Sequence, residues 1–112
     1  MVMWGYGEIV TANEGAYSTK PRPVLIMQNP QFSTGSSVIV APLTFAQNDE
    51  INTRIAVLPN RENGLDRACF VEVDKISAIR ASAIGTSVGH LEEDTLAKVT
   101  ALAIALISPA KV

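Results

Sequence analysis

Short runs of apolar residues, separated by turn-forming residues, fill the first two thirds of the chain. The runs recur roughly every ten residues, a spacing typical of antiparallel strands in a small barrel or sandwich and not of βαβ units. Two of them, 23–28 and 38–43, are almost continuously apolar, so we expect both faces of these strands to be covered. The expected strands are 8–11, 23–28, 38–43, 53–58, 69–73, 76–79 and 84–88.

Glycine, proline and small polar residues mark the connections between these runs. Residues 12–21 and 33–36 are rich in them and are expected to be loops. Asn63-Gly64 is a strong turn signal, because both residue types tolerate a left-handed backbone. Pro42 lies inside an apolar run. We expect it at a strand end, an edge or a bulge, because it cannot donate a ladder hydrogen bond.

Residues 69–73 alternate, so successive side chains should point to opposite faces of a strand. Val71 and Val73 should therefore share one face. Glu72 and Asp74 should share the other, which would bring two carboxylates together. A carboxylate near a cation could orient that cation or act as a base. The alternative is a solvated strand face with a simple ion pair.

The last segment changes period and predicts one amphipathic helix. Carboxylates at 92–94 suit the start of a helix, where the dipole favours negative charge, and Ser108-Pro109 should end it. The apolar residues lie three or four apart and form one stripe: Leu96, Val99, Leu102, Ala103 and Leu106. The fold class is therefore mainly β (α+β), a curled sheet with a C-terminal helix packed on it.

Composition and charge restrict the class of protein. The 112 residues fit a single domain over 1–112, and 47% hydrophobic with 18% charged residues is a globular composition. The net charge of −2 argues against a broad, non-specific nucleic-acid coat but leaves room for a local basic patch. No basic segment precedes an apolar run at the start, and no apolar stretch is long enough to cross a membrane. We therefore expect a cytoplasmic protein with no membrane partner.

Cysteine and histidine each occur once, as Cys69 and His90. This excludes an internal disulfide framework, a cysteine-rich zinc site and a multi-histidine metal site. We expect Cys69 to be an inert buried thiol and His90 to have a structural role. The prediction is a protein without a metal or another cofactor.

Lys20-Pro21-Arg22-Pro23 is the most informative stretch for chemistry. Each proline fixes its own φ, and Pro23 disfavours the helical region for Arg22, so Arg22 should be held extended at the mouth of a buried strand. A guanidinium held in this way suits a phosphate and the extra charge of a phosphorane. The alternative is a surface arginine at a strand edge, held in an ion pair.

Thr44 is the second candidate, because it follows the apolar run 38–43 at the point where a buried strand reaches the surface. Its hydroxyl could donate a hydrogen bond to a phosphate oxygen. The alternative is an ordinary threonine at the end of a strand.

Three segments in this order resemble the MazF/PemK toxins of bacterial type II toxin–antitoxin systems: Gly7-Glu8-Ile9-Val10, residues 20–29, and residues 38–44 with Ala41-Pro42-Leu43-Thr44 at their end. Later segments agree in order and spacing, namely 63–65, 71–75, 84–85 and 89–91. The resemblance covers nearly the whole chain. It implies an SH3-like β-barrel with a C-terminal helix, assembled as a homodimer.

The resemblance also implies an activity. Such toxins are metal-free, sequence-specific endoribonucleases that act on single-stranded RNA, and their partner is a cognate antitoxin of the MazE/PemI kind. The arginine and the threonine that match Arg22 and Thr44 are their catalytic pair, and some members use an aspartate that matches Asp74. Cleavage through the 2′-hydroxyl of the RNA leaves a 2′,3′-cyclic phosphate and a 5′-hydroxyl. Cutting messenger RNA in this way stops translation and growth.

With a net charge of −2, RNA affinity must come from a local patch. Lys20, Arg22 and Arg54 supply cations, and Tyr17 or Phe45 could stack on unpaired bases. For both aromatic residues the alternative is packing in a loop or in the core. The first loop, Gly15 to Lys20, departs from the Gly-Ser-Glu-Gln-Gly pattern of many family members. The candidate RNA-binding residues are Tyr17, Ser18, Thr19, Lys20, Phe45 and Arg54.

Two other functions stay open from the sequence. CcdB-type toxins resemble the MazF/PemK family in structure but poison DNA gyrase without cutting RNA. Such toxins are recognised by a C-terminal Trp-Gly-Ile sequence. This chain instead has Ser-Pro-Ala-Lys-Val at 108–112. The other alternative is an inactive barrel that is retained as a binding module.

Overall fold

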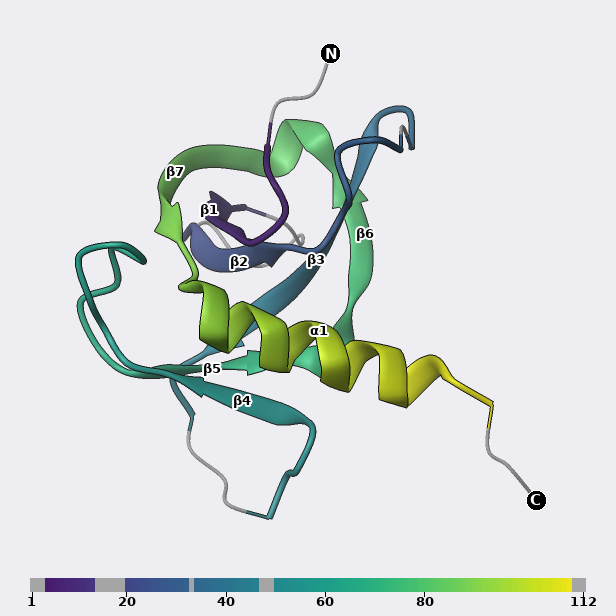
Figure 1. The fold of residues 1–112 in the computed structure, drawn as a ribbon. Coiled ribbons are helices and arrows are strands. Elements are labelled where there is room, and N and C mark those ends of the chain that lie inside the picture. Colours follow the sequence, from purple (N-terminus) through teal and green to yellow (C-terminus); the bar gives the residue numbers. More distant parts are fainter. Residues whose placement is uncertain (1–3, 14–19, 33, 47–49, 110–112) are drawn as a thin grey trace.

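The computed structural model describes residues 4–13, 20–32, 34–46 and 50–109. Over these residues the chain forms a curled antiparallel sheet, two short 3₁₀ turns and one helix (Figure 1). The strands are β1 (Glu8–Ala12), β2 (Arg22–Ile26), β3 (Ser37–Thr44), β4 (Arg54–Val57), β5 (Cys69–Glu72), β6 (Ser77–Arg80) and β7 (Ile84–His90). The 3₁₀ turns are η1 (Val73–Lys75) and η2 (Ala81–Ala83), and the helix is α1 (Glu93–Ile107). The predicted mainly-β fold with one C-terminal helix is confirmed.

The sheet has the strand order β4-β5-β3-β2-β1-β7, and β6 also pairs with β3. One edge of β3 pairs with β2, and the other edge is divided between two strands. On that divided edge Leu43 lies opposite Val71 of β5, and Val40 lies opposite Ser77 of β6. The turn η1 adds three residues between the two pairings, so β5 and β6 part from each other beside the middle of β3.

Pro42 lies inside β3, between the part that pairs with β6 and the part that pairs with β5. Proline has no N–H to donate, and at this interruption its absence breaks no ladder bond. The expectation of a strand end, an edge or a bulge is therefore wrong: Pro42 pairs with Val24 of β2 inside β3 and lies beside an interruption on the other edge of the strand.

The two apolar runs predicted to be covered on both faces are the centre of the molecule. Neighbouring residues of one strand belong to different cores: Leu25 packs in the cluster below α1, and Val24 packs in a second cluster on the other face. The first cluster includes Val99 of α1, and the second includes Val40 and Ile79. The central strands are thus covered by α1 on one side and by the curled sheet on the other.

The helix is held against the start of the chain at two points. Gly7 has φ +88, and a Cβ placed there would lie 2.5 Å from Leu96 Cδ2, so glycine allows the close approach of α1. The hydroxyls of Tyr6 and Thr100 are hydrogen-bonded at 2.6 Å. Among the described residues, no helix is both long and apolar enough to span a bilayer.

Candidate active site

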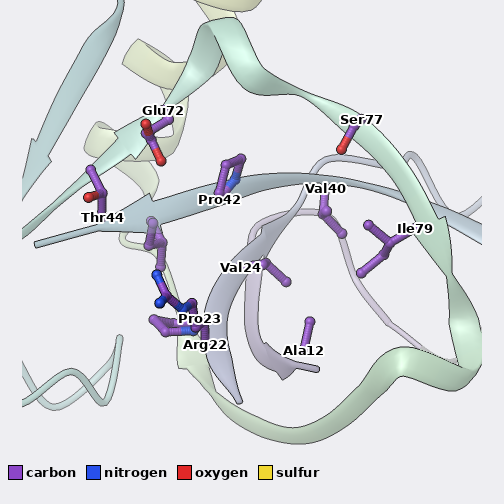
Figure 2. A pocket seen from close by; sticks show the side chains of 11 residues that line it. Ala12, Arg22, Pro23, Val24, Val40, Pro42, Thr44, Glu72, Ser77 and Ile79 are labelled. Carbon is purple, nitrogen blue, oxygen red and sulfur yellow. The ribbon is translucent and has the colours of Figure 1, made fainter. Parts of the chain in front are cut away.

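A cavity of about 390 Å³ opens beside β3, where β5 and β6 part from each other (Figure 2). Its apolar wall continues the second core cluster. Its polar groups come from four residues on four elements: Arg22, Thr44, Glu72 and Ser77. Figure 2 shows Arg22, Thr44 and Glu72 gathered near the tip of β3, with Ser77 at the other end of the cavity.

The pairing of β2 with β3 explains why Arg22 and Thr44 meet. Val24 lies opposite Pro42 in this antiparallel pair, and continuing the register by two residues sets Arg22 opposite Thr44. Directly opposed side chains lie on the same face, about 4.5–5.5 Å apart at Cβ. The proline-bracketed arginine and the strand-end threonine therefore line the same cavity, which agrees with the pairing that the resemblance implies.

Thr44 is half-buried, and its hydroxyl has one partner in the described structure. Thr44 Oγ1 accepts a hydrogen bond of 3.2 Å from the backbone N–H of Ala46. A hydroxyl that accepts in this way keeps its own hydrogen for donation. Thr44 is thus arranged as a donor toward the cavity that Arg22 lines.

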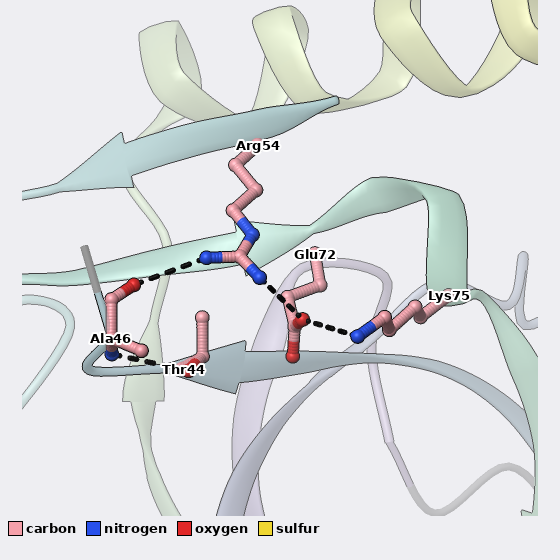
Figure 3. A network of polar contacts seen from close by, with 5 residues as sticks. All are labelled: Thr44, Ala46, Arg54, Glu72 and Lys75. Atoms are coloured by element: carbon pink, nitrogen blue, oxygen red, sulfur yellow. Dashed lines mark hydrogen bonds and ion pairs between the residues drawn. The ribbon is translucent and has the colours of Figure 1, made fainter. Parts of the chain in front are cut away.

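Glu72 is the third charged or polar group near this end of the cavity, and it is 8% exposed. It lies opposite Arg54 of β4. Its Oε2 accepts from Arg54 Nη2 at 3.2 Å and is paired with Lys75 Nζ at 3.0 Å (Figure 3). Arg54 Nη1 also donates to the carbonyl of Ala46 at 3.1 Å, so this network reaches the turn that follows Thr44.

This network changes how the prediction for Arg54 is understood. Arg54 was expected to contribute a cation to RNA binding, but its side chain is only 12% exposed and its guanidinium faces Glu72 and the carbonyl of Ala46. Arg54 Nε is buried and has no partner in the described residues. A guanidinium committed in this way offers little free surface to RNA, so the predicted contact has no support from its position.

Asp74 does not lie with Arg22 and Thr44. The strand ends at Glu72 and the chain enters η1, so the expected common strand face of Glu72 and Asp74 is wrong. Asp74 is exposed and lines a different cavity of about 550 Å³, beside α1 and Met27. Its catalytic role stays a prediction that rests on the resemblance alone.

The predicted aromatic contact Phe45 directly follows Thr44 and is 39% exposed. The guanidinium of Arg67 stacks over its ring at 3.7 Å from the centroid, a contact that the sequence analysis missed. The sequence carries no local signal for this contact, because it depends on the pairing of the end of β3 with the start of β5, where Thr44 lies opposite Phe70. Lys20 is exposed at the entry to β2, and Tyr17, Ser18 and Thr19 lie outside the described residues.

Of the remaining residues, Cys69 is buried as expected, and the structural role of His90 stays a prediction. Cys69 is buried, and its burial raises the pKa of the thiol to about 11, so it stays protonated and a poor nucleophile near neutral pH. His90 is exposed at the end of β7, where its backbone N–H donates to the carbonyl of Glu62. Within the described part of the chain, no three His, Cys, Asp or Glu side chains are grouped as metal ligands.

Comparison with known proteins gives a consistent result. A family model described as "PemK-like, MazF-like toxin of type II toxin-antitoxin system" matches residues 6–107. A relative from Mycolicibacterium smegmatis, named "Probable endoribonuclease MazF", is 37% identical over 93 residues, which is 82% of this chain and 85% of the relative.

Solved structures share the fold. An endoribonuclease from a Mycobacterial species, solved in complex with its cognate antitoxin, has a TM-score of 0.72 and 25% identity over 99% of this chain and 100% of that one. A MazE–MazF structure (Form-III) from Deinococcus radiodurans has a TM-score of 0.75 at 17% identity, over 96% of this chain and 98% of that chain. At this low identity the second likeness shows the fold alone.

Proposed function

Because the chain belongs to the PemK-like, MazF-like toxin family of type II toxin–antitoxin systems, we propose that it is a toxin of such a system that acts as an endoribonuclease. Its substrate is single-stranded RNA, messenger RNA in particular, which it cuts at specific sequences without a metal ion. The products carry a 2′,3′-cyclic phosphate and a 5′-hydroxyl, and the loss of messenger RNA stops translation and growth. The observation that carries this proposal is the meeting of Arg22 and Thr44 on one cavity.

Cleavage without a metal is chemically reasonable because RNA contains its own nucleophile. The 2′-oxygen attacks the adjacent phosphorus, a phosphorane forms, and the bond to the 5′-oxygen breaks. The phosphorane carries more negative charge than the diester, and a fixed guanidinium stabilises that extra charge. Arg22 takes this role, and Thr44 donates its hydroxyl hydrogen to a non-bridging oxygen.

RNA reaches the site along the exposed residues at the ends of β2 and β3. Lys20 supplies a second cation beside Arg22, and Phe45 with its stacked Arg67 offers a surface for an unpaired base. Tyr17, Ser18 and Thr19 complete the proposed RNA contacts. Base stacking and cation contacts of this kind suit single strands, whose bases are free to turn out.

The proposed partners are a cognate antitoxin and a second copy of the chain. The relative solved with its antitoxin supports the first, at 25% identity over 99% of this chain and 100% of that one. An acidic or apolar segment that covers Arg22 and Lys20 would neutralise the cations that RNA needs. Binding of the antitoxin in the cytoplasm would then suppress cleavage.

One experiment tests the core of the proposal. The purified protein is incubated with a long single-stranded RNA in excess EDTA, and the cut sites and end groups are mapped. Discrete cuts with 2′,3′-cyclic phosphate and 5′-hydroxyl ends support the proposal. Products with a 3′-hydroxyl and a 5′-phosphate, or cutting that EDTA abolishes, would refute the chemistry. A substrate with a single 2′-deoxy nucleotide at the cut site must resist cleavage there.

A further inference from the structure

The proposed chemistry leaves one task without a residue, which is to remove the proton from the 2′-hydroxyl. Arg22 cannot easily do this, because an arginine side chain is effectively always protonated. Thr44 is arranged as a donor. Among the described residues that line the cavity, Glu72 supplies the only carboxylate.

The two oxygens of Glu72 have different surroundings. Oε2 is held by Arg54 at 3.2 Å and by Lys75 at 3.0 Å. Oε1 takes part in no hydrogen bond within the described residues. One oxygen is therefore fixed from two sides, and the other is available to a molecule in the cavity (Figures 2 and 3).

The sheet register places this carboxylate close to the other two groups. Leu43 lies opposite Val71, so continuing the pairing by one residue sets Glu72 opposite Pro42. Glu72 is then a diagonal neighbour of Thr44 on the same face, and diagonal neighbours lie about 7–8 Å apart. A phosphodiester held between Arg22 and Thr44 would bring its sugar within reach of this side chain.

A bare carboxylate would repel the phosphates of RNA, and the local charges remove this objection. Arg54 and Lys75 together carry one more charge than is needed to neutralise Glu72. Arg22 adds a further positive charge on the same cavity. The cavity keeps a net positive charge although it contains a carboxylate.

We propose that Glu72 is the catalytic residue that accepts the proton of the 2′-hydroxyl, an inference that rests on the proposed function. Glu72 Oε1 takes the proton from the 2′-oxygen, and the electron pair of that O–H bond forms the new bond to phosphorus. The bond from phosphorus to the 5′-oxygen then breaks, and the leaving oxygen keeps the electron pair and takes a proton from water. Arg54 acts as a positioning residue, because it fixes the carboxylate and the turn after Thr44 together.

The first test is Glu72→Gln, measured in single-turnover reactions with an RNA that the wild type cuts. The glutamine carbonyl can still accept from Arg54 and Lys75, but the side chain cannot take up a proton. We expect the cleavage rate to fall by about 10²–10⁴-fold, the usual contribution of a general base. RNA affinity should be kept or increased, because a negative charge is removed from a phosphate site. Equal cleavage rates for E72Q and the wild type would overturn the proposal.

A matched control and a second measurement keep the test decisive if E72Q folds poorly. Glu62→Gln removes the same charge from an exposed loop residue and should leave the rate unchanged. The second measurement uses the wild type. Its cleavage rate should rise with pH over the acidic range in which the protein stays folded. The charged groups that face Glu72 are Arg54 on β4, Lys75 on η1 and Arg22 on β2, and all three are cations. A wild-type rate that is flat over this range would refute the role of Glu72.

The outcomes for Glu72 and for the proposed function are separable. If the wild type makes cyclic-phosphate ends and E72Q does so equally fast, only the role of Glu72 is lost. If the wild type cuts no RNA, or makes other ends, the proposed function itself fails.

Discussion

Two cavities in the described part of the molecule, one at the fork of β3 and one beside α1, differ in chemistry more than in size. The cavity at the fork of β3 measures about 390 Å³ and brings an arginine, a threonine and a glutamate together at one end. The cavity beside α1 is larger, about 550 Å³, and most of its lining is apolar, with Ile104, Leu106 and Ile107 from the end of the helix. The smaller cavity is the one whose groups suit a reaction.

The difference shows how the fold separates chemistry from packing. Glu72 and Asp74 are two residues apart, yet they line different cavities because the strand ends between them. On the face of the sheet that α1 covers, Val99 is completely buried in the main core cluster. We therefore expect substitutions in the first cavity to reduce activity and substitutions on the α1 side to reduce stability.

Apart from Glu72→Gln, the largest effect is expected for Arg22→Ala. Loss of one group that stabilises transition-state charge should lower kcat/KM by about 10²–10³-fold. The melting temperature should stay unchanged, because Arg22 is exposed and belongs to neither core cluster. Arg80→Ala, which removes an exposed arginine from β6, is the control. If R22A keeps wild-type activity, the role assigned to the first cavity is wrong.

A smaller loss is expected for Thr44→Val, which keeps the branched shape but removes the hydroxyl. A hydrogen bond to a charged group contributes about 1.5–3 kcal/mol, so kcat/KM should fall roughly 10- to 150-fold. Thr44→Ser restores the hydroxyl and should recover most of the rate. Equal losses for T44V and T44S would mean that the shape of the side chain matters and its hydroxyl does not.

On the other side of the sheet, Val99→Ala should change stability and leave the chemistry alone. Removing two buried methyl groups and leaving a small cavity should lower the free energy of unfolding by about 2 kcal/mol. Urea unfolding measures this, with the exposed neighbour Lys98→Ala as the control. At a temperature where both variants are folded, V99A should cut RNA at the wild-type rate. A rate reduced as much as that of R22A would show that the two sides are not independent.

Most of the fold could be predicted from the sequence, because the signals are local. Apolar residues spaced three or four apart, after the short apolar runs, predicted α1. The continuous apolar runs 23–28 and 38–43 predicted the two central strands. Arg22 and Thr44 were found for a similar reason, since each lies at the end of a buried run. Their meeting depends on strand register, which pairs Val24 with Pro42 across a loop.

The rest of the site depends on a turn without a sequence signal. Val73-Asp74-Lys75 contains no glycine or proline, and its alternation is compatible with a continuing strand. Only the pairing of β3 with both β5 and β6 shows that three extra residues are accommodated there. The same turn places Lys75 against Glu72, so the ion-pair network could not be predicted either.

The last prediction concerns Asp74, on which the resemblance and the geometry disagree. Because Asp74 is exposed and lines the cavity beside α1, Asp74→Asn should change kcat/KM far less than E72Q, by a factor of about three or less, as expected for a surface charge. Paired single-turnover measurements of D74N and E72Q on one RNA make the comparison direct. If D74N loses as much activity as E72Q, the two carboxylates act together in spite of their separate cavities. A loss confined to D74N would transfer the proton-accepting role from Glu72 to Asp74, and the chain would then have to rearrange around η1 when RNA binds.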